Sequence, residues 1–145
     1  MAKDKLLKFD SVRPDDNQIR VLYNLLEARK YNISHREIPS YDEHTLFVKA
    51  EPYRAWYIIL YREKPIGSVY LTEDNSVGLN IEEEQIEQVL SGVINFVLER
   101  HKPNPGLKSL RCDRFSVNVS PSNKKLISAM EKSGAEVIQI CFALE

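Results

Sequence analysis

Apolar residues recur about every two residues in some segments of the chain, as in strands, and about every 3.6 residues in others, as in helices. Residues 54–62 (Arg-Ala-Trp-Tyr-Ile-Ile-Leu-Tyr-Arg) are the most strand-like run, and the turn at 63–65 leads into a second strand at 66–72. Two strands joined by so short a turn form an antiparallel hairpin. Further strands are expected at 6–12, 76–81, 115–119 and 137–144.

Helical spacing of apolar residues predicts helices between these strands. Ser40 and Glu43 have the spacing of a capping box, which opens a helix that ends by Pro52. The longest apolar stripe covers 82–100. Gly92 lies inside this stripe and costs about 1 kcal/mol relative to alanine, so we expect a close packing contact there. The first helix is expected to bury Ile19, Leu22, Tyr23, Leu25 and Leu26.

The last third of the chain combines a strand, a short helix and another strand. Ser120 and Pro121 suit the N-cap and the first turn of the helix, and Gly134 suits its end. Residues 119–123 read Val-x-Pro-x-Asn, and residues 131–134 read Glu-Lys-x-Gly. Together with the order of strands and helices, these motifs resemble the GNAT superfamily of N-acetyltransferases over nearly the whole chain.

The resemblance implies a fold, an activity and a mode of assembly. The fold would be an α+β (three-layer α/β) GNAT domain over residues 1–145, with about four helices and a mixed, mostly antiparallel sheet of about six or seven strands. The activity would move an acetyl group from acetyl-CoA to an amine of a small molecule. Region 40–57 resembles members that acetylate nucleotide-linked amino sugars. The strand at 137–144 would be available for homodimer pairing, because end strands of this fold often pair between subunits.

The composition is that of an ordinary folded domain, and it limits the kinds of partner that we expect the protein to bind. The 145 residues are 43% hydrophobic and 28% charged, and 20 basic against 21 acidic residues leave a formal charge of −1. This balance argues against a broad basic face for nucleic acid. No apolar run approaches membrane-spanning length and no signal-peptide core follows the N-terminus, so we expect a cytoplasmic protein. Cys112 and Cys141 lack metal-ligand spacing and are expected to be buried thiols, with no metal bound.

Acetyl transfer from a thioester requires that the protein binds the thioester, that the amine is deprotonated and that the oxyanion is stabilised. By resemblance, Leu79, Asn80 and Ile81 would pair with the pantetheine arm of acetyl-CoA, and a backbone amide there would polarise the thioester. Asn123, Lys124 and Lys125 would contact the cofactor at the start of the last helix. The same residues equally suit a buried strand, a helix cap and solvated surface lysines.

Two features depart from the GNAT pattern. The glycine-rich loop that binds the pyrophosphate is absent, and 82–84 is Glu-Glu-Glu at the start of the long helix. Carboxylates there stabilise the helix by about 0.3–1 kcal/mol each and repel a phosphate. The frequent general-acid tyrosine, seven residues beyond Asn123, is Met130. Two alternatives therefore stay open: a non-catalytic binding or assembly module that has lost CoA binding, and an acyltransferase whose acyl donor is bound to a carrier protein.

Candidates for the general base and for acceptor binding lie in the first two thirds of the chain. His35, in a polar loop, and Glu73, in the turn between two strands, can each accept a proton. His44 is expected at the surface or as a capping group. The candidate acceptor contacts are Arg36, Arg54 and Tyr57.

Overall fold

The computed structural model describes residues 6–29, 38–106 and 113–144, and five strands within them form one sheet in the order β1-β2-β3-β4-β5. Neighbouring strands are antiparallel except for β4 and β5, which are parallel. The predicted fold class, with a mixed, mostly antiparallel sheet, is confirmed, although the described residues hold five strands rather than six or seven. The strands are β1 (Leu7–Ser11), β2 (Ala55–Tyr61), β3 (Lys64–Leu71), β4 (Ser76–Ile81) and β5 (Ser116–Val117).

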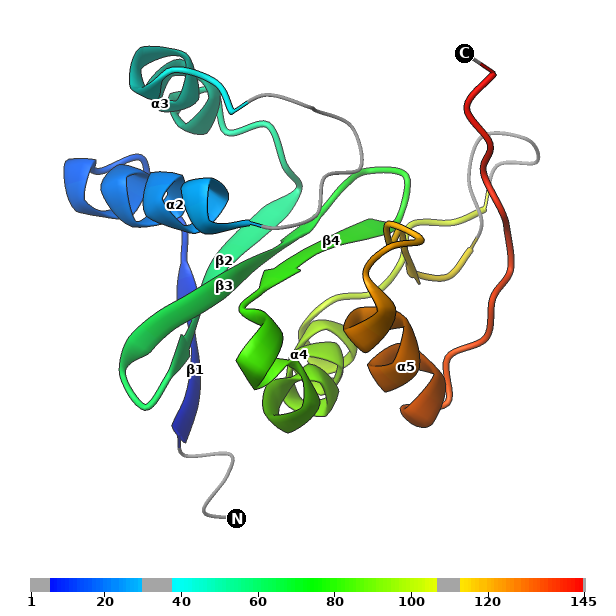
Figure 1. The fold of residues 1–145 in the computed structure, drawn as a ribbon. Helices are drawn as coiled ribbons and strands as arrows, with labels where there is room; N and C mark the ends of the chain where they lie inside the picture. Colours follow the sequence, from blue (N-terminus) through cyan, green and yellow to red (C-terminus); the bar gives the residue numbers. More distant parts are fainter. Residues whose placement is uncertain (1–5, 30–37, 107–112, 145) are drawn as a thin grey trace.

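Four α-helices in the described part of the chain cover the two faces of the sheet, which gives three layers (Figure 1). Helices α2 and α3 lie on one face, and α4 and α5 lie on the other. None of these helices combines the length and the apolarity needed to cross a bilayer. They are α2 (Asp16–Ala28), α3 (Tyr41–Lys49), α4 (Ile86–Arg100) and α5 (Lys124–Lys132), and the 3-10 turn η1 (Glu83–Gln85) precedes α4.

Side chains at the helix starts confirm one predicted cap and correct another. Ser40 Oγ accepts a hydrogen bond from Glu43 N at 3.1 Å, as the capping-box spacing predicts. The last helix begins later than expected, because Asn123 rather than Ser120 is its N-cap. Asn123 Oδ1 accepts from Leu126 N at 3.3 Å, and the residues before it form a turn.

Two apolar layers hold the helices against the sheet. At Gly92 a Cβ would lie 2.5 Å from Leu7 Cδ2, so the close contact predicted for this glycine is confirmed. Burying a large aliphatic side chain stabilises a fold by about 1.5–3 kcal/mol, so both layers contribute strongly. The layer under α4 contains Tyr57, Ile59, Ile66, Val69, Leu71, Val77, Val89, Val93 and Val97. The layer under α2 and α3 contains Ile19, Leu22, Val48 and Ile58.

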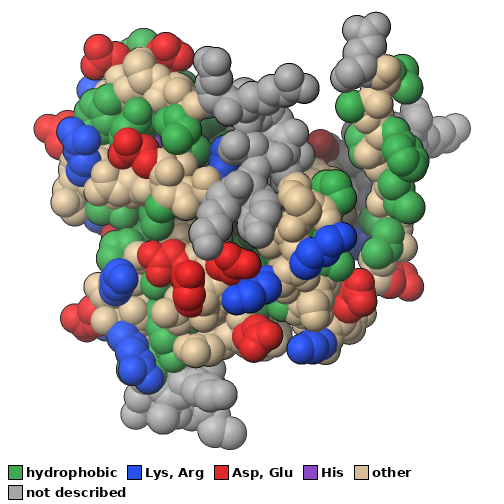
Figure 2. Space-filling model, viewed as in Figure 1, with side chains coloured by type: hydrophobic (Ala, Val, Ile, Leu, Met, Phe, Trp, Pro, Cys, Tyr) green, Lys and Arg blue, Asp and Glu red, His purple; other side chains and the backbone are tan. Residues whose placement is uncertain are grey.

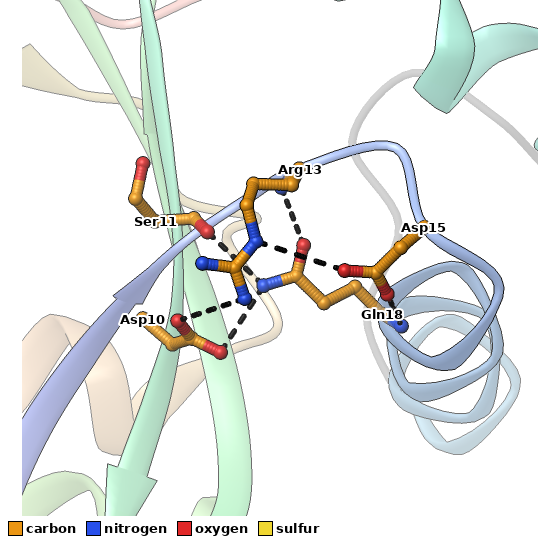
Figure 3. A network of polar contacts seen from close by, with 5 residues as sticks. All are labelled: Asp10, Ser11, Arg13, Asp15 and Gln18. Carbon is orange, nitrogen blue, oxygen red and sulfur yellow. Dashed lines mark hydrogen bonds and ion pairs between the residues drawn. The ribbon is translucent and has the colours of Figure 1, made fainter.

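Gln18, in the first turn of α2, connects this helix to the end of β1 (Figure 3). Only 3% of the residue is exposed. Its Nε2 donates to Asp10 Oδ2 at 3.1 Å and to the Ser11 carbonyl oxygen at 3.0 Å, and its Oε1 accepts from Arg13 N. Its backbone N donates to Asp15 Oδ1, the N-cap of α2, at 2.8 Å. A buried amide paired at both ends fixes the connection between strand and helix.

The predicted strand at 137–144 is wrong. This segment follows α5 as an extended chain that does not join the sheet (Figure 1). A strand requires a neighbour with free backbone groups, and β5 is only Ser116–Val117, which leaves little edge to pair with. The expected buried thiol at Cys141 is also wrong, because Cys141 lies on this segment and is exposed. Cys112 lies outside the described residues.

The expected surface position of His44 is wrong as well. His44 lies on the side of α3 that packs against α2, is 5% exposed, and has its ring centroid 5.2 Å from that of Tyr23. Burial lowers the pKa of His44 from its ordinary value of 6.5. His44 is therefore part of the packing between the two helices.

Candidate functional site

The parallel pair β4–β5 opens after its first two residues. Ser76 pairs with Ser116 and Val77 with Val117, and no later pair occurs in the described residues. β4 continues through 78–81 with β3 on one side. Its other side has no strand partner there within the part of the chain that the structure describes. After Val77 the sheet is therefore open between β4 and β5, and the side of β4 that faces this opening is its open edge.

The hydrogen bonds of β4 show which backbone groups face this opening. Thr72 N donates to the Ser76 carbonyl oxygen at 3.0 Å, and Glu82 N donates to the Ile66 carbonyl oxygen at 2.9 Å. Bonded and non-bonded pairs alternate along an antiparallel ladder. Even-numbered residues of β4 therefore bond to β3, and odd-numbered residues point their amide and carbonyl groups to the open side.

Of the three residues predicted to hold the cofactor arm, two have backbone groups that face the opening. Leu79 and Ile81 present backbone groups at the open edge, where the amides of an extended pantetheine chain can pair as a further strand would. Asn80 bonds through its backbone to β3, and its Nδ2 donates to the Leu25 carbonyl oxygen of α2 at 3.3 Å. The open edge thus fits the arm, and cofactor binding by these residues stays a prediction.

The start of α4 does not fit a pyrophosphate. β4 passes through Glu82 directly into η1, and no glycine lies in this connection. Gln85 is the N-cap of α4 and makes no side-chain capping bond. Figure 2 shows acidic side chains gathered over this part of the molecule, where Glu83 and Glu84 form the first turn. They complement the helix dipole, and a phosphate placed there would meet like charges.

The start of α5 lies next to the open edge. Leu126 of α5 packs in the same apolar cluster as the side chain of Leu79. Asn123 uses its side-chain oxygen to cap the helix, and Lys124 and Lys125 are exposed. A contact of these three residues with the cofactor stays a prediction, and the capping bond accounts for Asn123 without it.

On the sheet face toward α2, polar and aromatic side chains that the sequence analysis missed lie together. The cross-strand pairs Tyr70–Gly78 and Ser68–Asn80 are neighbours, and Tyr53 stacks on Tyr70 with ring centroids 3.8 Å apart. Burial, and then the adjacent Tyr70, raise the pKa of Tyr53, so its hydroxyl stays protonated and can donate a hydrogen bond. The available signal was the alternation of these residues along two predicted strands that follow one another in the sequence.

The tyrosine stack continues toward α3 as an aromatic wall. The ring of Trp56 meets Tyr53 edge-on at 4.8 Å, and Phe47 meets Tyr53 edge-on at 5.7 Å. Aromatic faces attract ammonium groups by roughly 0.5–2 kcal/mol. This wall, defined by Phe47, Tyr53, Trp56 and Tyr70, can therefore accept the hydrocarbon or the cationic part of an amine.

Glu73 lies in the turn before β4, next to the end of β4 that pairs with β5. Asn104 Nδ2 donates to the Glu73 carbonyl oxygen at 2.9 Å and to Glu73 Oε2 at 3.2 Å. Asn75, only 1% exposed, exchanges two hydrogen bonds with the backbone of Asn104. These contacts connect the turn to the chain that follows α4, and a role for Glu73 as general base stays a prediction.

Two predicted acceptor contacts have partners inside the protein. Tyr57 is buried under α4, and its hydroxyl lies 2.8 Å from His101 Nε2. It therefore lies on the sheet face opposite to the tyrosine stack. Arg54 Nη2 donates to the Lys102 carbonyl oxygen, and the guanidinium lies 5.7 Å from the centroid of the Phe115 ring. Contacts of Tyr57 and Arg54 with an acceptor stay predictions.

His35 and Arg36 fall in 30–37, outside the described residues. Leu25, near the end of α2, is the residue whose carbonyl oxygen accepts from Asn80 Nδ2. Among the residues that the structure does describe, no three His, Cys, Asp or Glu side chains gather as metal ligands would. At and beside the open edge, the described residues offer the backbone groups of Leu79 and Ile81 and the Asn80 carboxamide.

No protein-family model matches the sequence, and a search of curated proteins finds no match. Solved structures match in fold. A possible acetyltransferase from Clostridium difficile 630 has a TM-score of 0.55 and 16% identity, with 97% of each chain covered. The aminoglycoside N-acetyltransferase AAC(6')-Iy, solved with CoA, has a TM-score of 0.58 and 13% identity over 96% of this chain and 94% of its own. A dodecameric spermidine N-acetyltransferase from Vibrio cholerae has a TM-score of 0.55 and 19% identity over 90% and 79%.

These similarities extend over nearly the whole chain. The protein has the fold of the GNAT-type acetyltransferases, as its motifs indicate. At such identities the comparison defines the fold, and the activity depends on the site just described.

Proposed function

We propose that this protein is an N-acetyltransferase that moves an acetyl group from acetyl-CoA to an amine of a small molecule. The observation that carries the proposal is the opening between β4 and β5, where Leu79 and Ile81 present backbone groups beside α5 that no strand of the described residues pairs with. The pantetheine arm of acetyl-CoA carries amides, and these can pair with such an edge as a further strand would. The fold shared with acetyltransferases supports the same reading.

The reaction follows from the groups around the edge. The pantetheine amides pair with Leu79 and Ile81, and an edge amide donates to the thioester oxygen and stabilises the negative charge that develops there. The amine nitrogen attacks the carbonyl carbon, a C–N bond forms and the C–S bond breaks. A base, with His35 and a water chain as candidates, takes the proton from nitrogen. The sulfur leaves as thiolate without a required acid, because thiols ionise near neutral pH.

The acceptor approaches from the sheet face toward α2. The aromatic wall and the Asn80 side chain line this approach, and an amine-bearing molecule with an apolar or cationic stem suits them. The structural neighbours named above include enzymes for an aminoglycoside and for spermidine. We take amines of these kinds as the first acceptors, and the nucleotide-linked amino sugar as a narrower candidate.

A homodimer is part of the proposal. Residues 137–144 expose a row of large apolar side chains. A second copy offers the same segment, so the two chains can bury these side chains against each other around a two-fold axis. The cost of leaving such side chains in water favours this partner.

The test follows acetyl transfer by the thiol that it releases, with acetyl-CoA as donor and spermidine, an aminoglycoside and a nucleotide-linked amino sugar as acceptors. Leu79→Pro removes the amide N–H from the open edge without removing a bond to β3, and Leu79→Ala keeps that N–H. We expect KM for acetyl-CoA to rise about tenfold in the proline variant, as loss of one or two edge bonds implies, and to change far less in the alanine variant. Wild-type protein that releases no thiol with any acceptor, and whose melting temperature acetyl-CoA does not raise, would refute the proposal.

The second candidate function is a binding or assembly module that has lost CoA binding. The carboxylates of Glu82, Glu83 and Glu84 at the start of α4 favour it, because they stand where a phosphate would need the helix dipole. For this candidate, acetyl-CoA leaves the melting temperature unchanged at millimolar concentration. Free phosphopantetheine distinguishes an acyltransferase whose donor is bound to a carrier protein from both of these functions. It keeps one phosphate of CoA, lacks the adenosine 3',5'-bisphosphate part, and would then bind as well as CoA.

A further inference from the structure

A cavity of about 390 Å³ lies where the β2–β3 hairpin meets the start of α4. It lies on the β3 side of β4, away from the open edge. Its volume is in the range of small-molecule sites. None of the residues predicted from the sequence to bind cofactor or acceptor lines it. The lining residues are Tyr61, Arg62, Lys64, Ile66, Gln85 and Gln88.

The hairpin turn supplies positive charge to this cavity. Arg62 and Lys64 are its two cationic residues, and they come from a different element than the acidic start of α4. The turn is fixed in place, because Arg62 N donates to the Leu6 carbonyl oxygen at 2.9 Å and the guanidinium lies 5.5 Å over the Tyr61 ring. Arginine and lysine placed together at a cavity favour phosphate oxygens.

The helix side supplies a hydrogen-bond acceptor that is not used within the described protein. Gln85 Oε1 is buried and has no hydrogen-bond partner among the described residues. A buried carboxamide oxygen without a partner is unfavourable, so a ligand gains binding free energy if this side chain turns into the cavity and accepts an N–H or O–H from it. Gln88, one turn later on α4, adds a second carboxamide to the same cavity.

The wall between these polar groups is apolar. The ring of Tyr61 forms it, and Ile66, which is 1% exposed, lies buried next to it. A flat heterocycle suits such a wall, and its amino group or the hydroxyls of an attached sugar are donors for Gln85. One class of ligand carries a flat base, sugar hydroxyls and phosphate together.

We propose that the cavity binds a phosphorylated nucleoside, with its phosphate on Arg62 and Lys64 and a donor of its base or sugar on Gln85. This nucleoside has two sources, the adenosine end of acetyl-CoA or the nucleotide of a nucleotide-linked acceptor, and in either case the inference deepens the proposed function. For the cofactor, the hairpin turn replaces the phosphate loop that the start of α4 lacks.

The test is calorimetric titration of the whole protein with adenosine 3',5'-bisphosphate and with uridine diphosphate, as free probes of the two sources. The charge variant carries Arg62→Gln and Lys64→Gln, and the matched control carries Lys49→Gln and Lys132→Gln, at the exposed ends of α3 and α5. We expect one nucleotide to bind, to bind about tenfold more weakly to the charge variant, and to bind nearly unchanged to the control. Gln85→Leu should weaken the same nucleotide several-fold while leaving its salt dependence intact.

Binding of the adenosine probe assigns the site to the cofactor, and binding of the uridine probe assigns it to the acceptor. No binding of either probe at millimolar concentration, or equal binding by the wild type and the charge variant, overturns the inference. If acetyl transfer occurs and the charge variant binds acetyl-CoA and both probes as the wild type does, this inference fails and the proposed function stands. If a probe depends on Arg62 and Lys64 but no amine is acetylated, the proposed function fails and the nucleotide site stands.

Discussion

Tyr70 lies against Gly78 of the neighbouring strand so closely that a Cβ at position 78 would meet Tyr70 Cζ at 2.0 Å. The missing side chain leaves the space that the ring fills, and Tyr53 stacks on the same ring at 3.8 Å. The aromatic wall therefore depends on a glycine in β4.

Gly78→Ala should displace the Tyr70 ring. We expect the free energy of unfolding to fall by about 1–3 kcal/mol, the usual cost of overpacking, and KM for the amine to rise more than KM for acetyl-CoA. Denaturant unfolding and steady-state kinetics measure the two effects.

The double-mutant cycle with Tyr70→Ala is the control for this substitution. Once the ring is absent, Gly78→Ala has nothing to displace, so the two losses of stability should not add. Additive losses would show that the glycine is required for its backbone rather than for the space it leaves.

Gln18→Ala should destabilise the protein much more than a typical helix substitution. It removes the bonds to Asp10, Ser11 and Arg13 and leaves buried groups at the end of β1 without their partner. We expect a loss of about 2 kcal/mol, which lowers the melting temperature by about 4–8 °C in a chain of this size. Asn24→Ala, at an exposed site of the same helix, is the matched control, and an equal shift in both variants would contradict the role given to Gln18.

Much of the fold could be predicted because its signals are local. The hairpin of β2 and β3, the strand β4 and the long helix each have a periodicity that depends on neighbours in sequence. The cap of α3 at Ser40 follows from a spacing of three residues. At α5 two good cap residues compete, and the sequence does not show that Asn123 rather than Ser120 accepts the helix amide.

The site could be predicted only in part, because it depends on which residues of different strands face one another. The open edge at Leu79 and Ile81 followed from the family resemblance, and the residues themselves equally suit a closed strand. The contact of Tyr70 with Gly78 requires the register between β3 and β4, which local periodicity does not fix. His44 has no neighbour in sequence that indicates its burial against α2.

Stability should fall as the pH is lowered below about 6.5, because two histidines bind protons less readily in the folded protein. Burial lowers the pKa of His44, and burial, then Arg54, then Arg100, lower the pKa of His101. The unfolded chain takes up protons first, near 6.5, so stability is full above this pH and is lost as the pH falls toward the folded pKa values. Melting temperatures at pH 7.5 and at pH 5.5, roughly one unit to either side of the ordinary histidine value, measure this loss.

His44→Gln and His101→Gln should each reduce the difference between the two melting temperatures, and the double variant should reduce it further. Asp74, whose pKa its hydrogen bond from Thr72 lowers from an ordinary 3.8, loses its contribution only in more acid solution and does not interfere. A difference that both substitutions leave unchanged would assign the pH dependence to other groups.

The segment 137–144 should mediate association with a second copy through one of its two sides. Ile138, Ile140, Phe142 and Leu144 alternate along the extended chain and so share a side, and Phe142 and Leu144 are 80% and 97% exposed. We expect the wild type to be a dimer at micromolar concentration by light scattering, and Ile140→Ser combined with Phe142→Ser to be a monomer. Gln139→Ser combined with Ala143→Ser, on the other side, is the matched control and should remain a dimer. A monomeric wild type, or the same mass for both double variants, would contradict dimerisation through this segment. If the apolar side forms the interface, only substitutions on that side should produce a monomer.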